Sequence, residues 1–205
     1  MGPQVVAVPA SRREQAAQVL TLAFLDDPVF CALWPDPDRR QRILARSNDW
    51  GVRFAPPARR VVETTPSVTA VIMWSPPGHT TPRLVVLRSL PGLLRVRMAM
   101  SRAEASRWLG WLRRQEQRRH QLVPEPHWNL DVLGVHPDRQ RFGLGAVLVR
   151  HGLRRAEEGG VPVYVETDTE ANYAFYTKLG LDLVEYVEDY PPMNLPTWRM
   201  VRPAA

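Results

Sequence analysis

The chain has 205 residues, of which 44% are hydrophobic and 23% are charged. This composition is typical of a globular protein and excludes a mainly disordered one. The single cysteine, Cys31, excludes an internal disulfide framework and a cysteine-based metal site. No apolar run is long enough to span a bilayer, and residues 1–10 carry neither a secretory nor a myristoylation signal. We therefore expect one cytoplasmic domain over 1–205 with no membrane partner.

The formal net charge is +6, and the positive charge is concentrated in one segment. Ten arginines lie in 83–119, against the two acids Glu104 and Glu116. One interpretation is an electrostatic funnel for an anionic ligand or nucleic acid. The other is the solvated face of a helix, because apolar residues are interleaved with the arginines. The core side of that helix would carry Trp108, Leu109, Trp111 and Leu112. No nucleic-acid-binding motif is present, so we expect no nucleic-acid partner.

The first half of the chain predicts a mixture of strands and helices. Weak alternation predicts a strand over 4–8, and a capping box at Ser11 predicts a helix that reaches Leu25. Asp36, as N-cap before Pro37, begins a second helix that ends before residues 56–57. Three more elements follow, namely a hairpin, a short helix that stops at Pro91-Gly92, and a helix opened by a capping box at Ser101. They cover 61–74, 84–90 and 101–120.

The second half alternates strands and helices with short connections. The predicted strands cover 127–135, 161–166, 181–187 and 195–201. The predicted helices follow a loop at 137–145 and the strand that ends at 166, and they reach 158 and 179. This order predicts an α+β fold of three layers, with helices on both sides of a central sheet.

The loop between the first of these strands and the helix after it predicts an anion site. Gly143 and Gly145 remove the Cβ atoms that would keep a phosphate away from the backbone. The amides of the helix's first turn have no partner within the helix and, with the helix dipole, attract an anion. Arg139 and Arg141 add positive charge. The loop matches neither a P-loop nor the Gly-x-Gly-x-x-Gly fingerprint, since Leu148 replaces its third glycine.

The flanks of this loop resemble the GNAT superfamily of acyl-CoA-dependent N-acyltransferases. The string Gln140-Arg141-Phe142-Gly143-Leu144-Gly145 matches the superfamily's Gln/Arg-x-x-Gly-x-Gly/Ala pattern. It follows Leu133-Gly134-Val135-His136-Pro137, which is similar to the fourth strand and its proline exit. Downstream, the string from Asn172 to Gly180 is similar to the Asn-x-x-x-Tyr-x-x-x-Gly element. The resemblance covers about 124–202, which would be the cofactor-binding half. It implies a mixed, mostly antiparallel sheet of about seven strands flanked by helices.

Within the superfamily, two segments are similar to the puromycin N-acetyltransferases. They are Glu125-Pro126-His127-Trp128 and the closing Thr197-Trp198-x-Met200. Arg141 and Phe142 depart from the usual pattern, in which glycine and a basic residue are common. We therefore expect no glycine-type backbone conformation at Arg141.

The resemblance implies acetyl-CoA as the acyl donor. Backbone groups of Leu133, Gly134 and Val135 would pair with the pantetheine arm as an added strand does. Asn172 would help to position the cofactor, although an asparagine on a helix surface is the alternative interpretation. The pyrophosphate would be held by the loop residues Gln140, Arg141, Phe142, Gly143, Leu144, Gly145 and Ala146.

Three residues are the catalytic candidates. Tyr176 would donate a proton or hydrogen bond to the leaving sulfur, since a tyrosine with pKa about 10 can serve a thiolate with pKa near 8.5. Glu166 and Asp131 are candidates for the base that deprotonates the amine. Either acid has an alternative role as a structural partner of an arginine. The spacing of the histidines does not indicate a metal site, and we expect no metal.

The acceptor pocket is predicted between the first two helices. Asp26, Asp27, Phe30 and Trp34 form an acidic and aromatic cluster that would suit a cationic amine with a ring. The alternative is a helix-capping loop with packed aromatics. The function that the sequence favours is direct transfer of an acetyl group to a small-molecule primary amine in a ternary complex. A silent acyl-CoA-binding module and a protein-lysine acetyltransferase are the alternatives, and a homodimer stays open.

Overall fold

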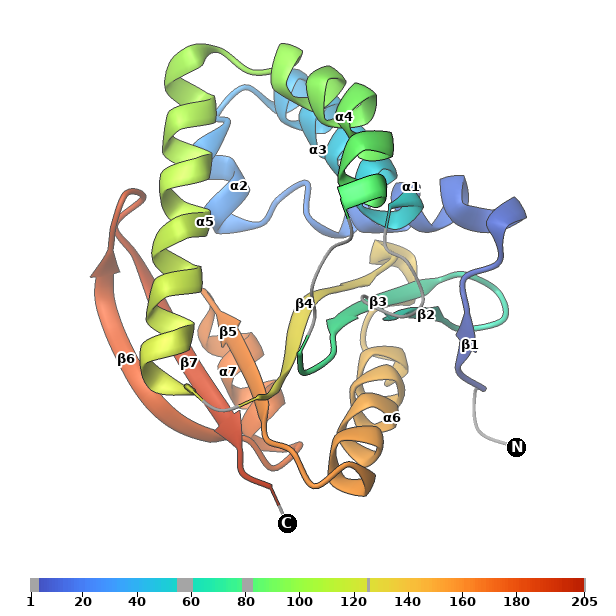
Figure 1. Ribbon diagram of the computed structural model, residues 1–205, viewed down its shortest axis with the longest axis vertical. Helices are drawn as coiled ribbons and strands as arrows, with labels where there is room; N and C mark the ends of the chain where they lie inside the picture. Colours follow the sequence, from blue (N-terminus) through green and yellow to red (C-terminus); the bar gives the residue numbers. More distant parts are fainter. Residues whose placement is uncertain (1–3, 55–60, 79–82, 125, 205) are drawn as a thin grey trace.

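The computed structural model describes residues 4–54, 61–78, 83–124 and 126–204. The strands are β1 (Val6–Ala7), β2 (Val61–Thr64), β3 (Ala70–Ser75), β4 (Trp128–Val135), β5 (Val163–Thr167), β6 (Asp182–Tyr190) and β7 (Leu195–Arg202). They form one sheet in the order β1-β2-β3-β4-β5-β7-β6 (Figure 1). The pair β4–β5 is parallel and the other pairs are antiparallel. The predicted GNAT-like α+β fold with a mostly antiparallel sheet is confirmed.

Helices cover both faces of this sheet (Figure 1). The first five are α1 (Arg13–Ala23), α2 (Pro28–Leu33), α3 (Pro37–Arg53), α4 (Arg83–Met98) and α5 (Arg102–Leu122). They lie on one face, where α1 packs on β3 and β4. On the other face, α6 (Leu144–Glu158) and α7 (Glu170–Thr177) enclose the largest apolar cluster with residues of β3, β4 and β5. This face buries Ile72, Trp74, Leu148, Val165 and Met200 completely.

The strands β4 and β5 separate soon after they meet. Their pairing is confined to Trp128 with Val163 and Asn129 with Tyr164. On the other side of β4, consecutive residues of β3 pair with Val132 and then with Leu130, which places a β-bulge at Asp131. A bulge bends its strand and is frequent beside active sites. The bulge therefore accompanies the separation of the two strands.

Two helix boundaries differ from the predictions. Ser11 lies in a short 3₁₀ helix, η1 (Ala10–Arg12), and α1 begins after Arg12 without a side-chain cap, so the predicted capping box there is wrong. The one at Ser101 is confirmed: Glu104 N donates to Ser101 Oγ at 3.2 Å, and Ser101 N donates to the Glu104 carboxylate at 2.6 Å. Sequence alone also missed α2, which Asp27 caps.

The helix predicted to end at Leu90 continues through Pro91 to Met98. A proline removes one helical hydrogen bond, but Pro91 is exposed, where water can satisfy the carbonyl left without a donor. On its inner side the helix packs closely against α3, since a Cβ added at Gly92 would lie only 2.6 Å from Trp50 Cδ1. Packing of α4 against α3 therefore outweighs the local signal to stop.

The core side predicted for α5 is correct only in part. Trp108 and Trp111 pack against the cluster formed with α2 and α3. Leu109 and Leu112 are exposed, because the tryptophans already fill the side of the helix that faces the molecule.

Candidate active site

A cavity of about 840 Å³ lies between the end of α1, β4, the start of α6 and α7. Most of the residues predicted to hold the cofactor line it. They are Leu133, Gly134, Val135, Gln140, Arg141, Gly143, Leu144, Gly145, Ala146, Asn172 and Tyr176. Phe142 is the exception, since its side chain is 71% exposed and does not line the cavity. The backbone of the loop, and not the phenyl ring, faces the space where a ligand would bind.

The loop before α6 leaves main-chain donors free. Gly143 is the N-cap of α6 with φ of 76°, and no side chain caps this helix end. The amides of the first turn therefore have no partner within the helix and can receive an anion. Arg141 has φ of 67°, in the left-handed region that favours glycine. The expectation that Arg141 avoids such a conformation is wrong, because the tight path of the loop requires it.

Close approach of backbones shapes the cavity wall. An added Cβ at Gly134 would lie 2.8 Å from Leu20 Cδ2 and 3.1 Å from Ala23 Cβ, so β4 touches α1 where only glycine fits. Gly145 differs, because its Cβ would lie 3.6 Å from Leu133 Cδ2, which is an ordinary contact. A side chain at Gly145 would therefore reduce the space of the cavity without a clash.

Tyr176 comes from α7, whose first turn is capped by Thr169. Its side chain is 6% exposed and lies edge-on to Phe175, with ring centroids 5.0 Å apart. Burial raises the pKa of the Tyr176 phenol well above its usual value. The group therefore stays protonated at neutral pH and is available as a donor toward the cavity.

Glu166 lies near the end of β5, on the face of the sheet opposite α6. Tyr164 Oη donates to Glu166 Oε2 at 3.0 Å, and Arg199 Nε lies 3.6 Å from the same oxygen. Burial raises the pKa of Glu166 to about 7, although the charge of Arg199 opposes the shift and that of Asp168 adds to it. A carboxylate with this pKa can exchange a proton near neutral pH.

Two more carboxylates lie close to this end of β5. Asp168 accepts from Thr197 Oγ1 at 2.6 Å, and burial raises its pKa to about 6, with the charge of Asp27 adding to the effect. Asp27 lines the cavity and accepts from Val29 N at 3.0 Å as the N-cap of α2. Burial raises the pKa of Asp27 as well. Because burial disfavours the ionised form of all three carboxyl groups, a cation beside them would stabilise that form.

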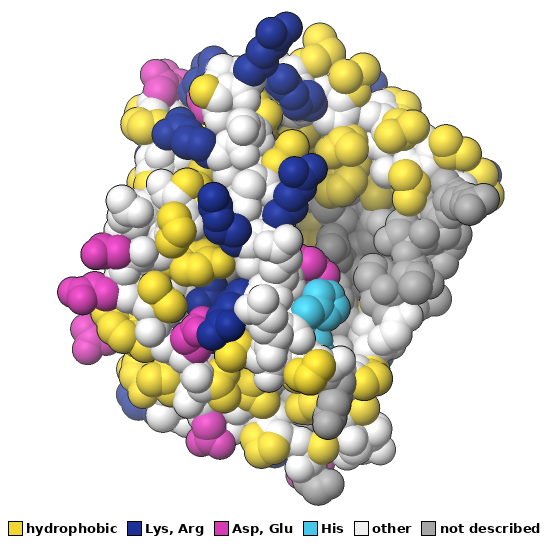
Figure 2. Space-filling view, turned by 60° about the vertical axis from the view of Figure 1, so that its left-hand side comes forward, with side chains coloured by type: hydrophobic (Ala, Val, Ile, Leu, Met, Phe, Trp, Pro, Cys, Tyr) yellow, Lys and Arg dark blue, Asp and Glu magenta, His cyan; other side chains and the backbone are white. Residues whose placement is uncertain are grey.

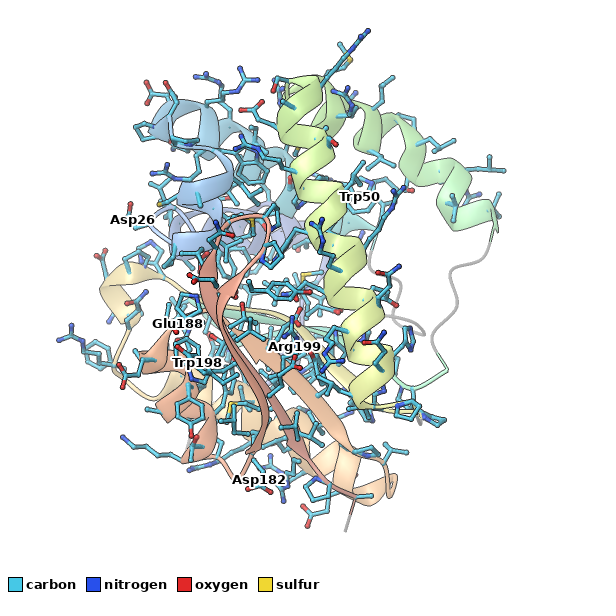
Figure 3. The ribbon with its side chains drawn as sticks, turned by 90° about the vertical axis from the view of Figure 1, so that its left-hand side faces the viewer. Asp26, Trp50, Asp182, Glu188, Trp198 and Arg199 are labelled. Carbon is cyan, nitrogen blue, oxygen red and sulfur yellow. The ribbon has the colours of Figure 1, made fainter. Side chains whose placement is uncertain are left out.

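Arg199 is the buried cation of this region, and Figure 3 shows it between the sheet and α5. It is fully buried. Nη1 donates to Glu185 Oε2 at 2.6 Å, Nη2 donates to Gln115 Oε1 at 2.8 Å, and the guanidinium lies 4.3 Å from the centroid of the Tyr190 ring. Because its strong hydrogen bonds go to Glu185 and Gln115, Arg199 neutralises Glu166 only in part.

Asp131 and the aromatic acceptor candidates have structural partners. Asp131 accepts from Ser75 Oγ at 2.6 Å and Asn129 Nδ2 at 2.5 Å, and neither Asp131 nor Glu166 is among the residues that line the cavity. Phe30 and Trp34 stack with ring centroids 5.5 Å apart. Trp34 is 1% exposed in the core and does not line the cavity, and its contact with the acceptor stays a prediction. Phe30 is half-buried against the same cluster and does not line the cavity either.

Asp168 and Arg199 were not predicted from the sequence. Tyr164 and Glu166 alternate along β5 and share one face, and Asp168 continues this period of two directly after the strand ends at Thr167. That signal was available for Asp168. The position of Arg199 opposite Glu166 depends on the register between β5 and β7, which the sequence does not reveal.

Among the described residues, no group of three or more metal-ligating side chains is close enough to hold a metal ion. No helix in the described part of the chain is long and apolar enough to cross a membrane.

Comparison with known proteins agrees with the fold. The model of the acetyltransferase (GNAT) family matches residues 101–181. A crystal structure described as histone acetyltransferase HPA2 and related acetyltransferase, from Corynebacterium glutamicum, has a TM-score of 0.70 at 22% identity and covers 100% of this chain and 98% of its own. The polyamine N-acetyltransferase of Drosophila melanogaster has a TM-score of 0.64 at 17% identity, covering 97% of this chain and 98% of its own.

Among curated proteins, the chain is similar to the mycothiol acetyltransferase of Streptomyces coelicolor. The two are 46% identical over 52 residues, which are 24% of this chain and 17% of that protein. The match therefore spans about a sixth of the length of that relative. The puromycin-type likeness stays a prediction. The GNAT family model therefore matches the part of the chain from α5 to α7, and the solved structures share the fold over nearly the whole chain.

Proposed function

We propose that the protein transfers the acetyl group of acetyl-CoA directly to a primary amine of a small molecule. The observation that carries this proposal is the cavity itself, where the uncapped start of α6 and the phenol of Tyr176 line one space. The family generally uses acetyl-CoA, and the residues present fit it. The free amides suit its pyrophosphate, and Gly145 leaves room that a Cβ would fill.

Acetyl-CoA supplies an activated acetyl group as a thioester, with a thiol as the leaving group. Main-chain groups of 133–135 would hold the pantetheine arm. The amides of the loop, with Arg139 and Arg141, would hold the phosphates, and Asn172 would orient the arm. All of these residues except Phe142 line the cavity.

Glu166 would take the proton of the incoming amine. An amine with pKa near 10.4 is protonated at pH 7, and neutralising it costs about 4.6 kcal/mol. The raised pKa of Glu166 brings it closer to that of the amine, which makes the proton transfer less unfavourable. Asp131, the other candidate, accepts two side-chain hydrogen bonds, from Ser75 and Asn129, whereas Glu166 accepts one, from Tyr164.

Tyr176 would assist departure of the sulfur. With its pKa raised by burial, the phenol is a weaker acid than a thiol, so it stabilises the developing negative charge mainly by donating a hydrogen bond. This role needs the hydroxyl group and not a full proton transfer.

The acceptor would be a cationic amine rather than an acid. Asp27, Glu166 and Asp168 supply negative charge, and Arg199 offsets only part of it. The similar structure from Drosophila melanogaster is named as a polyamine N-acetyltransferase, which is consistent with this substrate class.

Two measurements on the purified full chain test the proposal. Acetyl-CoA at 100 times its Kd is expected to stabilise the fold by about 2.7 kcal/mol in a thermal shift assay. Thiol release should then require an amine, with diamines compared against amino acids and lysine peptides. Stabilisation without thiol release from any amine would indicate a silent acyl-CoA-binding module. If millimolar acetyl-CoA gave neither stabilisation nor thiol release, the proposal would be refuted.

A further inference from the structure

The outer face of α4 carries an unusual concentration of exposed apolar side chains. Among the described residues, fourteen large hydrophobic side chains are exposed, and seven of them belong to this one helix. They are Leu84, Val86, Leu87, Leu90, Leu93, Leu94 and Met98. Figure 2 shows hydrophobic side chains gathered at the upper right of that view, with basic side chains beside them. Exposed patches of this kind mark interaction sites.

These side chains follow the helical repeat. Leu84, Leu87, Leu90, Leu94 and Met98, which we call the α4 stripe, recur at steps of three or four residues. At 1.5 Å per residue the stripe is about 21 Å long. The opposite side of the helix faces α3, with Ser89 and Val96 buried and Trp50 Nε1 donating to the Ser89 carbonyl at 3.1 Å. Packing thus fixes the stripe outward.

Arginines border the stripe on both sides. Arg88 and Arg95, seven residues apart, lie along one flank, and Arg97 lies along the other, all of them exposed. The sequence from 64 to 103 contains no aspartate or glutamate. The partner of this face must therefore accept apolar side chains at its centre and offer negative charge around them.

We propose that α4 docks on the surface of an anionic lipid bilayer, with the α4 stripe inserted among the acyl chains and the arginines at the headgroups. An apolar helix face bordered by basic residues binds membranes in this way. The stripe lies on the exposed face of a single helix, and a deformable lipid surface can follow its relief. A second copy is disfavoured, because two such faces would bring their arginines together.

The absence of a spanning helix among the described residues does not oppose this proposal, since α4 would lie on the membrane and not cross it. The sequence-based expectation of no membrane partner rested on spanning segments and lipid-attachment signals. Neither signal reports on an exposed helix face. The proposal is also independent of the proposed acetyl transfer.

Flotation of the full chain with vesicles tests the proposal. Vesicles of phosphatidylcholine alone are compared with vesicles that contain equal parts of phosphatidylcholine and phosphatidylglycerol. Binding is expected only to the anionic vesicles and should weaken as salt rises. The double variants Leu87→Gln/Leu94→Gln and Arg88→Gln/Arg95→Gln should each weaken binding about tenfold or more.

The matched control is Leu183→Gln/Val184→Gln, which removes two exposed apolar side chains from β6. It should bind as the unchanged chain does. Circular dichroism of each variant checks that the fold is retained. Three outcomes would overturn the proposal: no binding of the unchanged chain to anionic vesicles, equal loss in the control, or a dimer in size-exclusion chromatography that the α4 stripe variant abolishes.

Discussion

The two sides of the gap between β4 and β5 are built differently. On the side that we propose for acetyl-CoA, called the donor side, the cavity is formed mainly by main-chain groups and glycines from two short stretches, 133–146 and 171–176. On the side that we propose for the amine, called the acceptor side, the polar groups come from α2, α5, β5, β6 and β7 and interact through buried charges. The first arrangement is local in sequence, and the second exists only when the sheet has formed.

This difference indicates which amino-acid substitutions each side can tolerate. Main-chain donors are retained when side chains change, so the donor side can keep its anion site although Arg141 and Phe142 depart from the usual pattern. Buried charges depend on one another, because removing one partner leaves another charge uncompensated. We therefore expect substitutions on the acceptor side to have the larger effects.

The largest expected effect is that of Glu166→Gln. A general base contributes about 10²- to 10⁴-fold, so kcat/KM with an amine of pKa near 10 should fall by that factor. The unchanged protein should lose activity as pH falls below about 7, where Glu166 becomes protonated. Asp131→Asn is the matched control and should change kcat/KM less than about tenfold. If instead Asp131→Asn lowers kcat/KM by 10²-fold or more and Glu166→Gln does not, the base is Asp131.

The next effect belongs to the donor side. Tyr176→Phe should lower kcat about 10- to 100-fold, because it would remove the hydrogen bond that we propose from the buried phenol to the leaving sulfur. The Kd for acetyl-CoA, measured by calorimetry, should stay within about twofold. Tyr173→Phe on the same helix is the control, since Tyr173 stacks on Trp198 instead. Full turnover by Tyr176→Phe would remove Tyr176 from the mechanism.

The same difference explains how much the sequence could predict. The loop from Gln140 to Ala146 and the helix with Asn172 and Tyr176 were found because each depends on neighbouring residues. The contacts of Arg199 join β7 to α5 and β6, and no local pattern reports them. Likewise, Pro91 was a sound local signal to end α4, but tertiary packing against Trp50 overrides it. The burial of Trp34 could not be predicted either, because an aromatic residue next to an acid in the sequence can belong to a core or to a pocket.

Stability measurements sharpen the acceptor-side comparison. The pKa of Glu166 is raised on folding, so protonation stabilises the folded state: the contribution is fully present below about pH 4.5 and is lost as pH rises through about 7. Glu166→Gln should therefore raise the free energy of unfolding at pH 8 by about 1 to 3 kcal/mol, with little change at pH 5. Urea denaturation at the two pH values measures this. Lower stability of the variant at pH 8 would mean that Arg199 and Tyr164 stabilise the carboxylate more than burial disfavours it.

The smallest effect tests whether the donor side is truly tolerant. Gly145→Ala places a methyl group in ordinary contact with Leu133, so the free energy of unfolding should change by less than about 1 kcal/mol. The methyl group narrows the cavity, and the Kd for acetyl-CoA should rise about tenfold, or 1.4 kcal/mol. Gly110→Ala in α5 is the control, because its Cβ would meet only Arg114 Nη1, at 3.7 Å, and no effect on binding is expected. An unchanged Kd in Gly145→Ala would place the cofactor elsewhere, because a ligand that follows this loop cannot avoid the added carbon.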